Sequence, residues 1–269
     1  MSLLLVRKIK FSFATVLLLC QNQVFAETFL VEGRSYYPAD ISEIEACENA
    51  RLDAKMKAMS EAGLERGRFF TLDICSESSE GAHCSLIQES QSYFDGGYIK
   101  SQEIIEKQII NTTQRECIIK AKFDVQKFKT KPDLNFLLEA DLNQRKFFSG
   151  QKVVVSGNVN PSAYIYLLDV NTKTDMLSLI VPNDYDKQIF TEDEFQLPSR
   201  QKQKFYDIYA YIPEDRRSDE LSEFMILLAT KQKFDLLSQT SESNFYKRLD
   251  ELGRSNWRKI DLGYTIYRN

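Results

Sequence analysis

Apolar and polar residues alternate over much of the chain, and this pattern predicts more strand than helix. Residues 115–126 are the clearest case, with four apolar side chains set between charged ones: Ile119, Ala121, Phe123 and Val125. A period of two residues places these side chains on one face of a strand. Residues 76–82 are polar and predict a loop. Further strands are expected at 29–37, 68–75, 87–94, 98–110, 134–142, 152–159, 163–170, 176–181, 205–212, 223–230 and 258–267.

One segment of the first half follows the period of a helix instead. Six residues recur every three or four positions and so share one face: Ile44, Cys47, Ala50, Ala54, Ala58 and Ala62. Asp40 stands three positions before Glu43, as in a capping box, and Gly63 is expected to end the helix. Because the face is nearly all alanine, we expect it to lie very close to a sheet. A shorter helix is expected at residues 243–252.

The two halves of the chain differ in composition. Residues 27–128 contain the long helix and four cysteines, whereas residues 133–269 contain no cysteine and consist mainly of predicted strands. The charged segment 127–132 ends in proline and suits a short linker. We therefore predict an α+β fold. An N-terminal domain at 27–128, with one helix on an antiparallel sheet, precedes a mostly β, sandwich-like domain at 133–269 that ends in a short helix and a strand.

The first 26 residues have the order of a secretory signal peptide. Basic residues precede an apolar run at 11–19, and Val24 and Ala26 occupy positions −3 and −1 of a cut after Ala26. The run is shorter than the roughly 20 residues that span a bilayer. We predict a periplasmic or secreted protein. A retained anchor and a lipidated Cys20 are the alternatives, although Leu19 stands where a lipobox normally has a small residue.

The net charge of the chain limits the classes of partner that we expect it to bind. Residues 1–26 hold three basic and no acidic residues, so their removal changes the formal charge from −4 to −7 (−4 − 3). A negative charge argues against general nucleic-acid binding, which needs a basic face. It also argues against electrostatic docking on anionic lipid, so any contact with a membrane is expected to be peripheral.

Four cysteines remain after the predicted cut, namely Cys47, Cys75, Cys84 and Cys117. An even number in an oxidising compartment suggests two disulfides, and four cysteines allow three pairings. We favour Cys75–Cys84, which closes a short loop, and Cys47–Cys117, which ties the helix to a strand. A metal site is the alternative, but the chain has no C-x-x-C pair and a single histidine, His83. No metal and no cofactor are expected.

Two pairs of tyrosines lie at alternate positions in predicted strands, Tyr164 with Tyr166 and Tyr209 with Tyr211. They could form a row that binds a ligand. The same spacing also results when such rings divide between the core and cross-strand pairs. Pro182 and Asn183 follow a third strand, where proline ends the strand and asparagine can bond to its own turn. These six residues are the candidate binding residues.

Catalytic motifs are missing from the sequence. It has no G-x-S-x-G, no P-loop, no G-x-G-x-x-G and no H-E-x-x-H, so we expect a non-enzymatic protein. Carboxylates cluster at 184–194, where Asp184 and Asp186 supply too few ligands in register for a calcium loop and a solvated acidic loop is favoured. The acidic residues leave one enzymatic alternative, a carboxylate-dependent hydrolase of cell-wall or surface glycan. A secreted ligand-binding protein is another alternative.

The second half resembles a known bacterial family. Four segments carry the resemblance, in this order: SGQKVVV at 149–155, AYIYLLDV at 163–170, LIVPN at 179–183 and FQLP at 195–198. Together they resemble domain-of-unknown-function family 4384 over about residues 134–235. Two features depart from its pattern, since 171–175 contain no glycine and Ala163 stands where glycine is usual. The resemblance implies an immunoglobulin-like, all-β accessory module in envelope or secreted proteins, without a catalytic residue that could be transferred.

The first half is similar to a looser group. Glu32-Gly33-Arg34, followed by the helix segment ARLDAKMKA at 50–58, resembles the N-terminal domain of flagellar assembly protein T and the LPP20-type envelope lipoproteins. This resemblance covers about residues 29–126 and implies a periplasmic assembly or ring component. The combined prediction is an exported envelope protein that binds other envelope proteins, within a flagellar or secretion apparatus.

Overall fold

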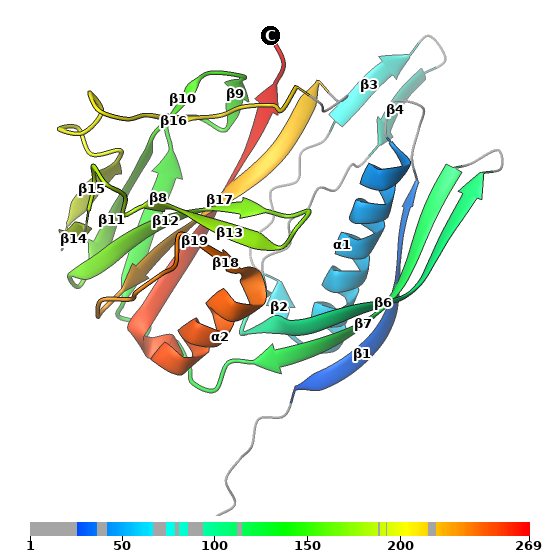
Figure 1. Cartoon of the computed structure of the whole chain (residues 1–269), viewed down its shortest axis with the longest axis horizontal. Coiled ribbons are helices and arrows are strands. Elements are labelled where there is room, and N and C mark those ends of the chain that lie inside the picture. Colours follow the sequence, from blue (N-terminus) through cyan, green and yellow to red (C-terminus); the bar gives the residue numbers. More distant parts are fainter. Residues whose placement is uncertain are drawn as a thin grey trace, which may run out of the picture.

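The computed structural model describes residues 26–36, 42–66, 74–78, 81–85, 94–111, 115–187, 189–191, 193–214 and 219–269, and for 65–66, 74–78, 81–85, 94–95 and 189 it describes the backbone alone. The fold of these residues is α+β and mostly β, as predicted (Figure 1). The predicted signal peptide, apart from Ala26, lies outside them, as do Asp40 and Cys20. No helix in the described part is long and apolar enough to span a membrane.

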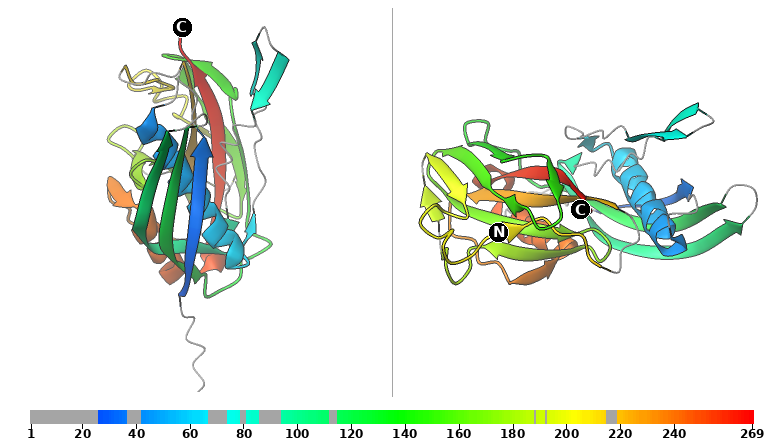
Figure 2. Two further views of the ribbon diagram at one scale, coloured as in Figure 1. Left: turned by 90° about the vertical axis from the view of Figure 1, so that its right-hand side faces the viewer. Right: turned by 90° about the horizontal axis from the view of Figure 1, so that it is seen from above.

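The N-terminal half contains a three-stranded antiparallel sheet of order β1-β7-β6. The strands are β1 (Glu27–Tyr36), β7 (Arg115–Lys127) and β6 (Gly97–Asn111). All three are predicted strands and are confirmed. Helix α1 (Glu43–Glu61) lies across one face of this sheet, mainly over β1 and β7 (Figure 2). Ile119, Ala121, Phe123 and Val125 of β7 pack with α1, whereas Lys120 and Lys122 alternate with them and lie on the other face.

The alanine face allows α1 to come unusually near the sheet. Ala46, Ala50, Ala54 and Ala58 are fully buried. A Cβ atom added to Gly33 of β1 would lie 1.9 Å from the carbonyl oxygen of Ala50, which leaves no room for a side chain there. Close contact between helix and sheet is therefore confirmed, and it depends on small residues on both elements.

Two details of the predicted helix are wrong. The N-cap is Ser42, whose hydroxyl accepts a hydrogen bond from the Glu45 N–H at 3.1 Å, rather than Asp40. Ile44 is 70% exposed, because in the first turn the buried face passes through Ala46 and Cys47. The end is as predicted, since Gly63 adopts a φ of +71° just beyond the last turn.

Four short strands, in two antiparallel pairs, are described between α1 and β6. Strand β2 (Glu65–Arg66) pairs with β5 (Phe94–Asp95), and β3 (Ile74–Ser78) pairs with β4 (Gly81–Ser85). The predicted loop at 76–82 is therefore wrong, because most of it belongs to β3 and β4. The predicted strands at 68–75 and 87–94 lie largely outside the described residues.

The C-terminal half is built on a seven-stranded sheet of order β18-β13-β12-β17-β19-β9, with β14 also paired to β12. Its strands are β9 (Lys146–Phe148), β12 (Ala163–Asn171), β13 (Met176–Val181), β14 (Ile189–Thr191), β17 (Glu220–Thr230), β18 (Gln239–Ser241) and β19 (Trp257–Tyr267). The others are antiparallel, whereas β9 joins β19 in parallel. The short strands β9, β14 and β18 are not among those predicted from the alternation of residues.

Smaller sheets complete a sandwich. One has the order β15-β11-β8 and the other pairs β10 with β16; their bounds are β8 (Leu137–Leu142), β10 (Lys152–Val153), β11 (Val155–Asn160), β15 (Glu194–Leu197) and β16 (Ile208–Tyr209). Val155 and Leu197 on this side pack with Leu167 and Leu227 of the large sheet. The predicted strand at 205–212 shrinks to β16, and the predicted strand at 152–159 is divided at Val154.

Helix α2 (Glu242–Leu252) covers the other face of the large sheet. Its Phe245 and Leu249 are fully buried with Trp257, which follows the short 3-10 helix η1 (Arg254–Asn256). Ser241 caps α2 by accepting from the Asn244 N–H at 3.3 Å. The predicted helix at 243–252 is confirmed within one residue.

The predicted linker is packed between the two halves. Phe128 contacts Tyr98 of β6 and Trp257, with ring centroids 5.6 and 5.3 Å apart. The Lys129 N–H donates to Asp250 of α2 at 2.9 Å, and Thr130 accepts from the Arg254 N–H at 2.6 Å. The halves are therefore joined by a shared hydrophobic cluster. Figure 2 shows the two halves side by side.

An ionic network at the same junction links α1 to the second half. Arg51 lies 2.7 Å from Asp175 in the β12–β13 turn, and Lys55 lies 3.2 Å from Asp175 and 2.5 Å from Glu242. Asp175 has a φ of +51° at the turn that lacks a glycine. Burial opposes ionisation of the Asp175 carboxyl, but Lys55 and Arg51 outweigh it and lower its pKa.

Candidate functional site

The four predicted tyrosines do not form one row. Tyr166 is buried, and its hydroxyl accepts a hydrogen bond from the Phe234 N–H at 2.8 Å. Tyr164 pairs across strands with Phe190, with ring centroids 4.7 Å apart. Tyr209 and Tyr211 are each 53% exposed, on and after β16 in another sheet. One ring thus lies in the core, one forms a cross-strand pair and two are on the surface. This arrangement agrees with the alternative given for their spacing, in which the rings divide between the core and cross-strand pairs.

Pro182 and Asn183 shape the corner after β13. The Asn183 side chain accepts from the N–H groups of Tyr185 and Asp186 at 2.8 and 2.9 Å, and its amide donates to the Ile180 carbonyl at 2.9 Å. These bonds close a turn of the asparagine's own segment. The contacts of Asn183 therefore fix the turn with which the following loop begins.

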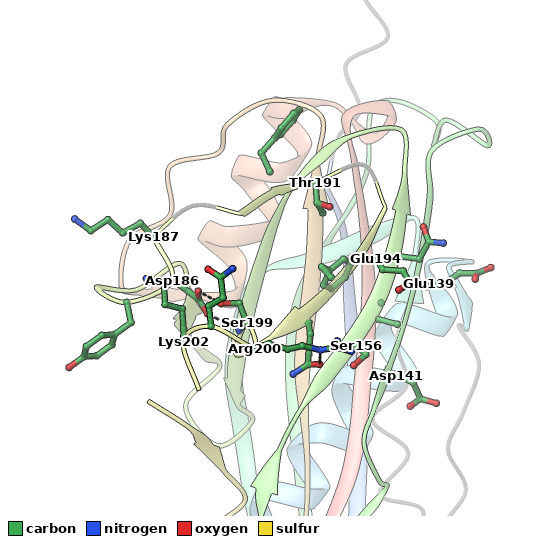
Figure 3. A pocket seen from close by; sticks show the side chains of 18 of the residues that line it. Glu139, Asp141, Ser156, Asp186, Lys187, Thr191, Glu194, Ser199, Arg200 and Lys202 are labelled. Carbon is green, nitrogen blue, oxygen red and sulfur yellow. Dashed lines mark hydrogen bonds between the residues drawn. The ribbon is translucent and has the colours of Figure 1, made fainter. Parts of the chain in front are cut away.

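That loop, residues 183–206 as far as described, is organised around a buried carboxylate. Asp186 is 5% exposed and accepts from the Ser199 N–H at 3.0 Å, the Ser199 hydroxyl at 2.7 Å and the Tyr206 hydroxyl at 2.7 Å. Burial, together with this bond to Asp186, raises the pKa of Tyr206. Both Asp186 oxygens are thus engaged in holding the loop, which leaves this carboxylate a structural role (Figure 3).

The loop presents an exposed stack of aromatic rings. Tyr185 stacks on Phe205 and on Tyr206, with centroids 6.0 and 5.7 Å apart and planes within 6° and 16° of parallel. Tyr185 and Phe205 are 50% and 53% exposed. The ammonium groups of Lys202 and Lys204 lie 5.7 and 4.9 Å from the Phe205 ring centre, which favours its orientation. We call Tyr185, Phe205 and Tyr206 the aromatic stack.

Beside the aromatic stack lies an open depression of about 1390 Å³ over the outer face of the β15-β11-β8 sheet. Its lining is polar and is interrupted by Tyr185 and the exposed Phe190. Figure 3 shows Lys187, Arg200 and Lys202 at the side of the Asp186 loop, and Glu139 and Asp141 of β8 at the opposite side. The polar lining from the sheet comprises Glu139, Asp141, Ser156, Asn158, Glu194 and Gln196.

The acidic residues at 184–194, which are clustered in the sequence, do not lie together in the structure. Asp184 and Glu194 are exposed at the depression, Asp186 is buried beneath the loop, and Glu192 lies outside the described residues. Within the described part of the chain, no group of three or more His, Cys, Asp or Glu residues is placed to hold a metal ion. The exposed carboxylates at the depression that the hydrolase alternative could use are Glu139, Asp141, Asp184 and Glu194.

A second exposed region lies in the N-terminal half and is not among the candidate residues of the sequence analysis. Ile104, Ile105 and Ile109 of β6 are 53%, 51% and 36% exposed. Strand β6 is an edge of its sheet, and among the described strands it pairs with β7 alone. The sequence does show that this strand is rich in isoleucine, but the edge position depends on strand order, which alternation cannot provide.

Each of the four cysteines lies on an element that neighbours the element of another cysteine. Cys47 of α1 and Cys117 of β7 form a disulfide, one of the two pairings favoured above. Cys75 and Cys84 are directly opposite in the register of β3 and β4. Their side chains, and that of His83, are not described, but cross-strand neighbours have the Cα spacing that a disulfide needs. The pairing of Cys75 with Cys84 stays a prediction.

Comparisons of the chain with protein families, with curated proteins and with solved structures found no match. The resemblances to family 4384 and to flagellar assembly protein T therefore remain predictions. The class of protein that the fold defines is a two-part α+β protein, with a disulfide-linked N-terminal layer and a β sandwich. Its function has to be inferred from its surfaces.

Proposed function

We propose that this chain is an exported envelope protein that binds other proteins as an assembly component, and that the edge of β6 is a contact surface. The observation that carries the proposal is the exposure of Ile104, Ile105 and Ile109 on a strand with no outer neighbour in the described structure. An edge strand offers unpaired backbone groups to an extended segment of a partner, and side chains at alternate positions add specificity.

The position of the edge segment supports a role in recognition. The beginning of β6 is covered by the second half, since Ser243 of α2 donates to the Lys100 carbonyl at 2.6 Å. Residues 103–109 lie beyond this contact and are exposed. Exposed apolar side chains at a free edge favour association with another chain. The proposed partner strand therefore pairs with residues 103–110.

The charges of the edge limit which partners it accepts. Glu103, Glu106 and Lys107 stand beside the isoleucines, and the ladder with β7 shifts register between Ile104 and Glu106. Charged residues and bulges are features that prevent indiscriminate pairing of edge strands. A partner must therefore supply complementary charges as well as an apolar strand.

Export and the apparatus are supported by the sequence. The leader-like residues 1–26, together with the Cys47–Cys117 disulfide, suit an oxidising compartment. The similarity of residues 29–126 to flagellar assembly protein T points to a flagellar or secretion apparatus. N-terminal sequencing of the native protein should begin at Glu27, and an intact Met1 would contradict export with cleavage.

Site-directed photo-crosslinking in the native host tests the contact surface. A photoreactive residue at position 105 should give a discrete protein adduct in the envelope fraction, and Ile109→Lys in the same chain should reduce its yield. The matched control is position 237, because Leu237 is 62% exposed in the other half. The same adduct from both positions, or none from position 105, would contradict the proposal.

A further inference from the structure

The loop around Asp186 has features that binding through β6 leaves unused. It combines the aromatic stack with Lys187, Arg200, Lys202 and Lys204, and it borders the open depression over the small sheet. We propose that this depression is a binding site for an acidic polysaccharide, with the aromatic stack and the four cations as its recognition elements. This inference goes beyond the proposed function and rests on a different region.

The cations of the loop are available to a ligand. Among the described residues, no carboxylate lies within salt-bridge distance of Lys187, Arg200, Lys202 or Lys204, although many other lysines and arginines of the chain form such pairs. Arg200 instead donates to Gln196 at the floor of the depression, at 3.2 Å. Lysine and arginine side chains that form no salt bridge within the described structure can attract carboxylate or phosphate groups of a ligand, and Arg binds them with two parallel hydrogen bonds.

The aromatic stack adds an apolar face to this positive edge. Tyr185 and Phe205 expose half of their surface, yet Tyr206 beneath them is fixed by Asp186. A rigid, exposed ring offers a flat apolar surface at little cost in conformational entropy. Sugar rings present a C–H face of matching shape, so the stack and the cations together suit a ring that carries a negative group.

The remaining lining favours a hydroxyl-rich ligand over a nucleic acid. Glu139, Asp141, Asp184 and Glu194 share the depression with Ser156 and Asn158. Carboxylates accept hydrogen bonds from hydroxyl groups, but they repel a polymer with a phosphate at every unit. An acidic glycan, with many hydroxyls and sparser charge, can use both sides of the depression.

The size of the depression favours a polymer. Sites for one small molecule have volumes of about 300–1,000 Å³ and enclose most of the ligand. The depression here is larger, about 1390 Å³, and open along the sheet. Several consecutive sugar residues could lie across it, from the cations of the loop toward β8.

Affinity electrophoresis of the full-length exported chain tests the site. Native gels containing hyaluronate, a polymer with one carboxylate per two sugar residues, should retard the protein, whereas gels containing neutral dextran should not. Tyr185→Ala, Phe205→Ala and Arg200→Gln should each raise the dissociation constant about tenfold, which corresponds to one lost contact of ordinary strength. Retardation should also decrease as salt concentration rises.

The chain provides matched controls on its own surface. Tyr209→Ala and Tyr211→Ala remove tyrosines as exposed as Phe205, and Lys233→Gln removes an exposed lysine of the same half. We expect each control to bind within about twofold of the wild type, which is a small free-energy change. The thermal midpoint of every variant is measured in parallel, so that weakened binding counts only for variants that fold.

Four results would overturn the assignment. They are equal retardation by dextran, no retardation by hyaluronate, losses in the control variants as large as in Tyr185→Ala, and tighter binding of single-stranded poly-dT than of hyaluronate. The last result would assign the aromatic stack and the cations to nucleic acid. The test is independent of the β6 surface, because photo-crosslinking at position 105 is scored without any glycan.

Discussion

The two halves of the molecule bury their cores in different ways. In the N-terminal half, α1 lies on the sheet through alanines and Gly33, and the Cys47–Cys117 disulfide ties the two layers together. In the C-terminal half, large aliphatic and aromatic side chains fill the space between two sheets and beneath α2. Alanine contributes little apolar area, so the first half depends on close approach and a covalent link, whereas the second depends on buried area.

The halves also differ in what they leave uncovered. The seven-stranded sheet is covered on one face by the smaller sheets and on the other by α2. The three-stranded sheet of the first half leaves the edge of β6 open. This difference is the reason that the proposed contact surface lies on the N-terminal layer and not on the faces of the sandwich.

The largest expected effect comes from the disulfide. The double substitution Cys47→Ser and Cys117→Ser should lower the free energy of unfolding by about 4 kcal/mol, because the bond closes a loop between residues 70 positions apart. Denaturant unfolding measures this loss. The control is the double variant Cys75→Ser and Cys84→Ser, whose shorter separation predicts a smaller loss; an equal or larger loss there would contradict the comparison.

The next effect concerns the sandwich core. Leu167 in the middle of β12 is fully buried between the sheets, so Leu167→Ala should cost about 3 kcal/mol through lost apolar contact and an unfilled cavity. Leu237→Ala, at a side chain 62% exposed, should change stability by less than about 0.5 kcal/mol. If the two variants unfold at the same denaturant concentration, the core does not depend on buried area as we infer.

Adding a single methyl group should harm the N-terminal half. Gly33→Ala places a Cβ against the Ala50 carbonyl and forces α1 away from the sheet, at a cost of about 2 kcal/mol. Thermal unfolding of the oxidised protein gives the measurement. Glu32→Ala, on the opposite face of the same strand, is the control. Unchanged stability of Gly33→Ala would show that the layers can separate without loss.

The smallest effect is expected at the junction of the halves. Asp175→Asn keeps a residue that tolerates positive φ but removes the charge that Arg51 and Lys55 contact, so we expect a loss of about 1–2 kcal/mol at neutral pH. Asp235→Asn is the control, since its ion pair with Lys233 is exposed and spans 3.9 Å.

The pH dependence gives this prediction a sign. Because the pKa of Asp175 is lowered in the folded state, its contribution is complete above the unfolded value of about 3.9 and disappears as the pH falls below it. The difference in stability between wild type and Asp175→Asn should therefore shrink on acidification below about pH 4. A constant difference down to pH 2 would contradict the role given to the charge.

Local patterns anticipated the long elements and failed at the short ones. Strands β1, β6, β7, β12, β17 and β19 and both helices follow from alternation or helical period. The cap is at Ser42 rather than Asp40, and Ile44 is exposed, because the phase of the first turn depends on what the helix meets. Strand β9 has three residues and pairs with Thr265 and its neighbours, a partner that no local pattern indicates.

The candidate surfaces show the same limit. The tyrosine spacing at 164–166 and 209–211 is visible in the sequence, but the sheets carry the two pairs to different places. The aromatic stack joins Tyr185 to Phe205 and Tyr206 across about 20 positions that include β14 and β15, and the hydrogen bond from Tyr206 to the buried Asp186 helps to hold the rings together. Neither the alternation of apolar residues nor the spacing of tyrosines in the sequence can predict a loop that is held by one carboxylate.

By itself, the sequence determined the α+β class, the alanine face of α1 and the corner at Pro182 and Asn183, because these depend on interactions between residues near in the chain. The tertiary structure decided which strand became an edge, which tyrosines were buried and which cations form no salt bridge with the described residues. Those properties depend on contacts between distant residues, and the free energy of such contacts is set only when the layers pack together.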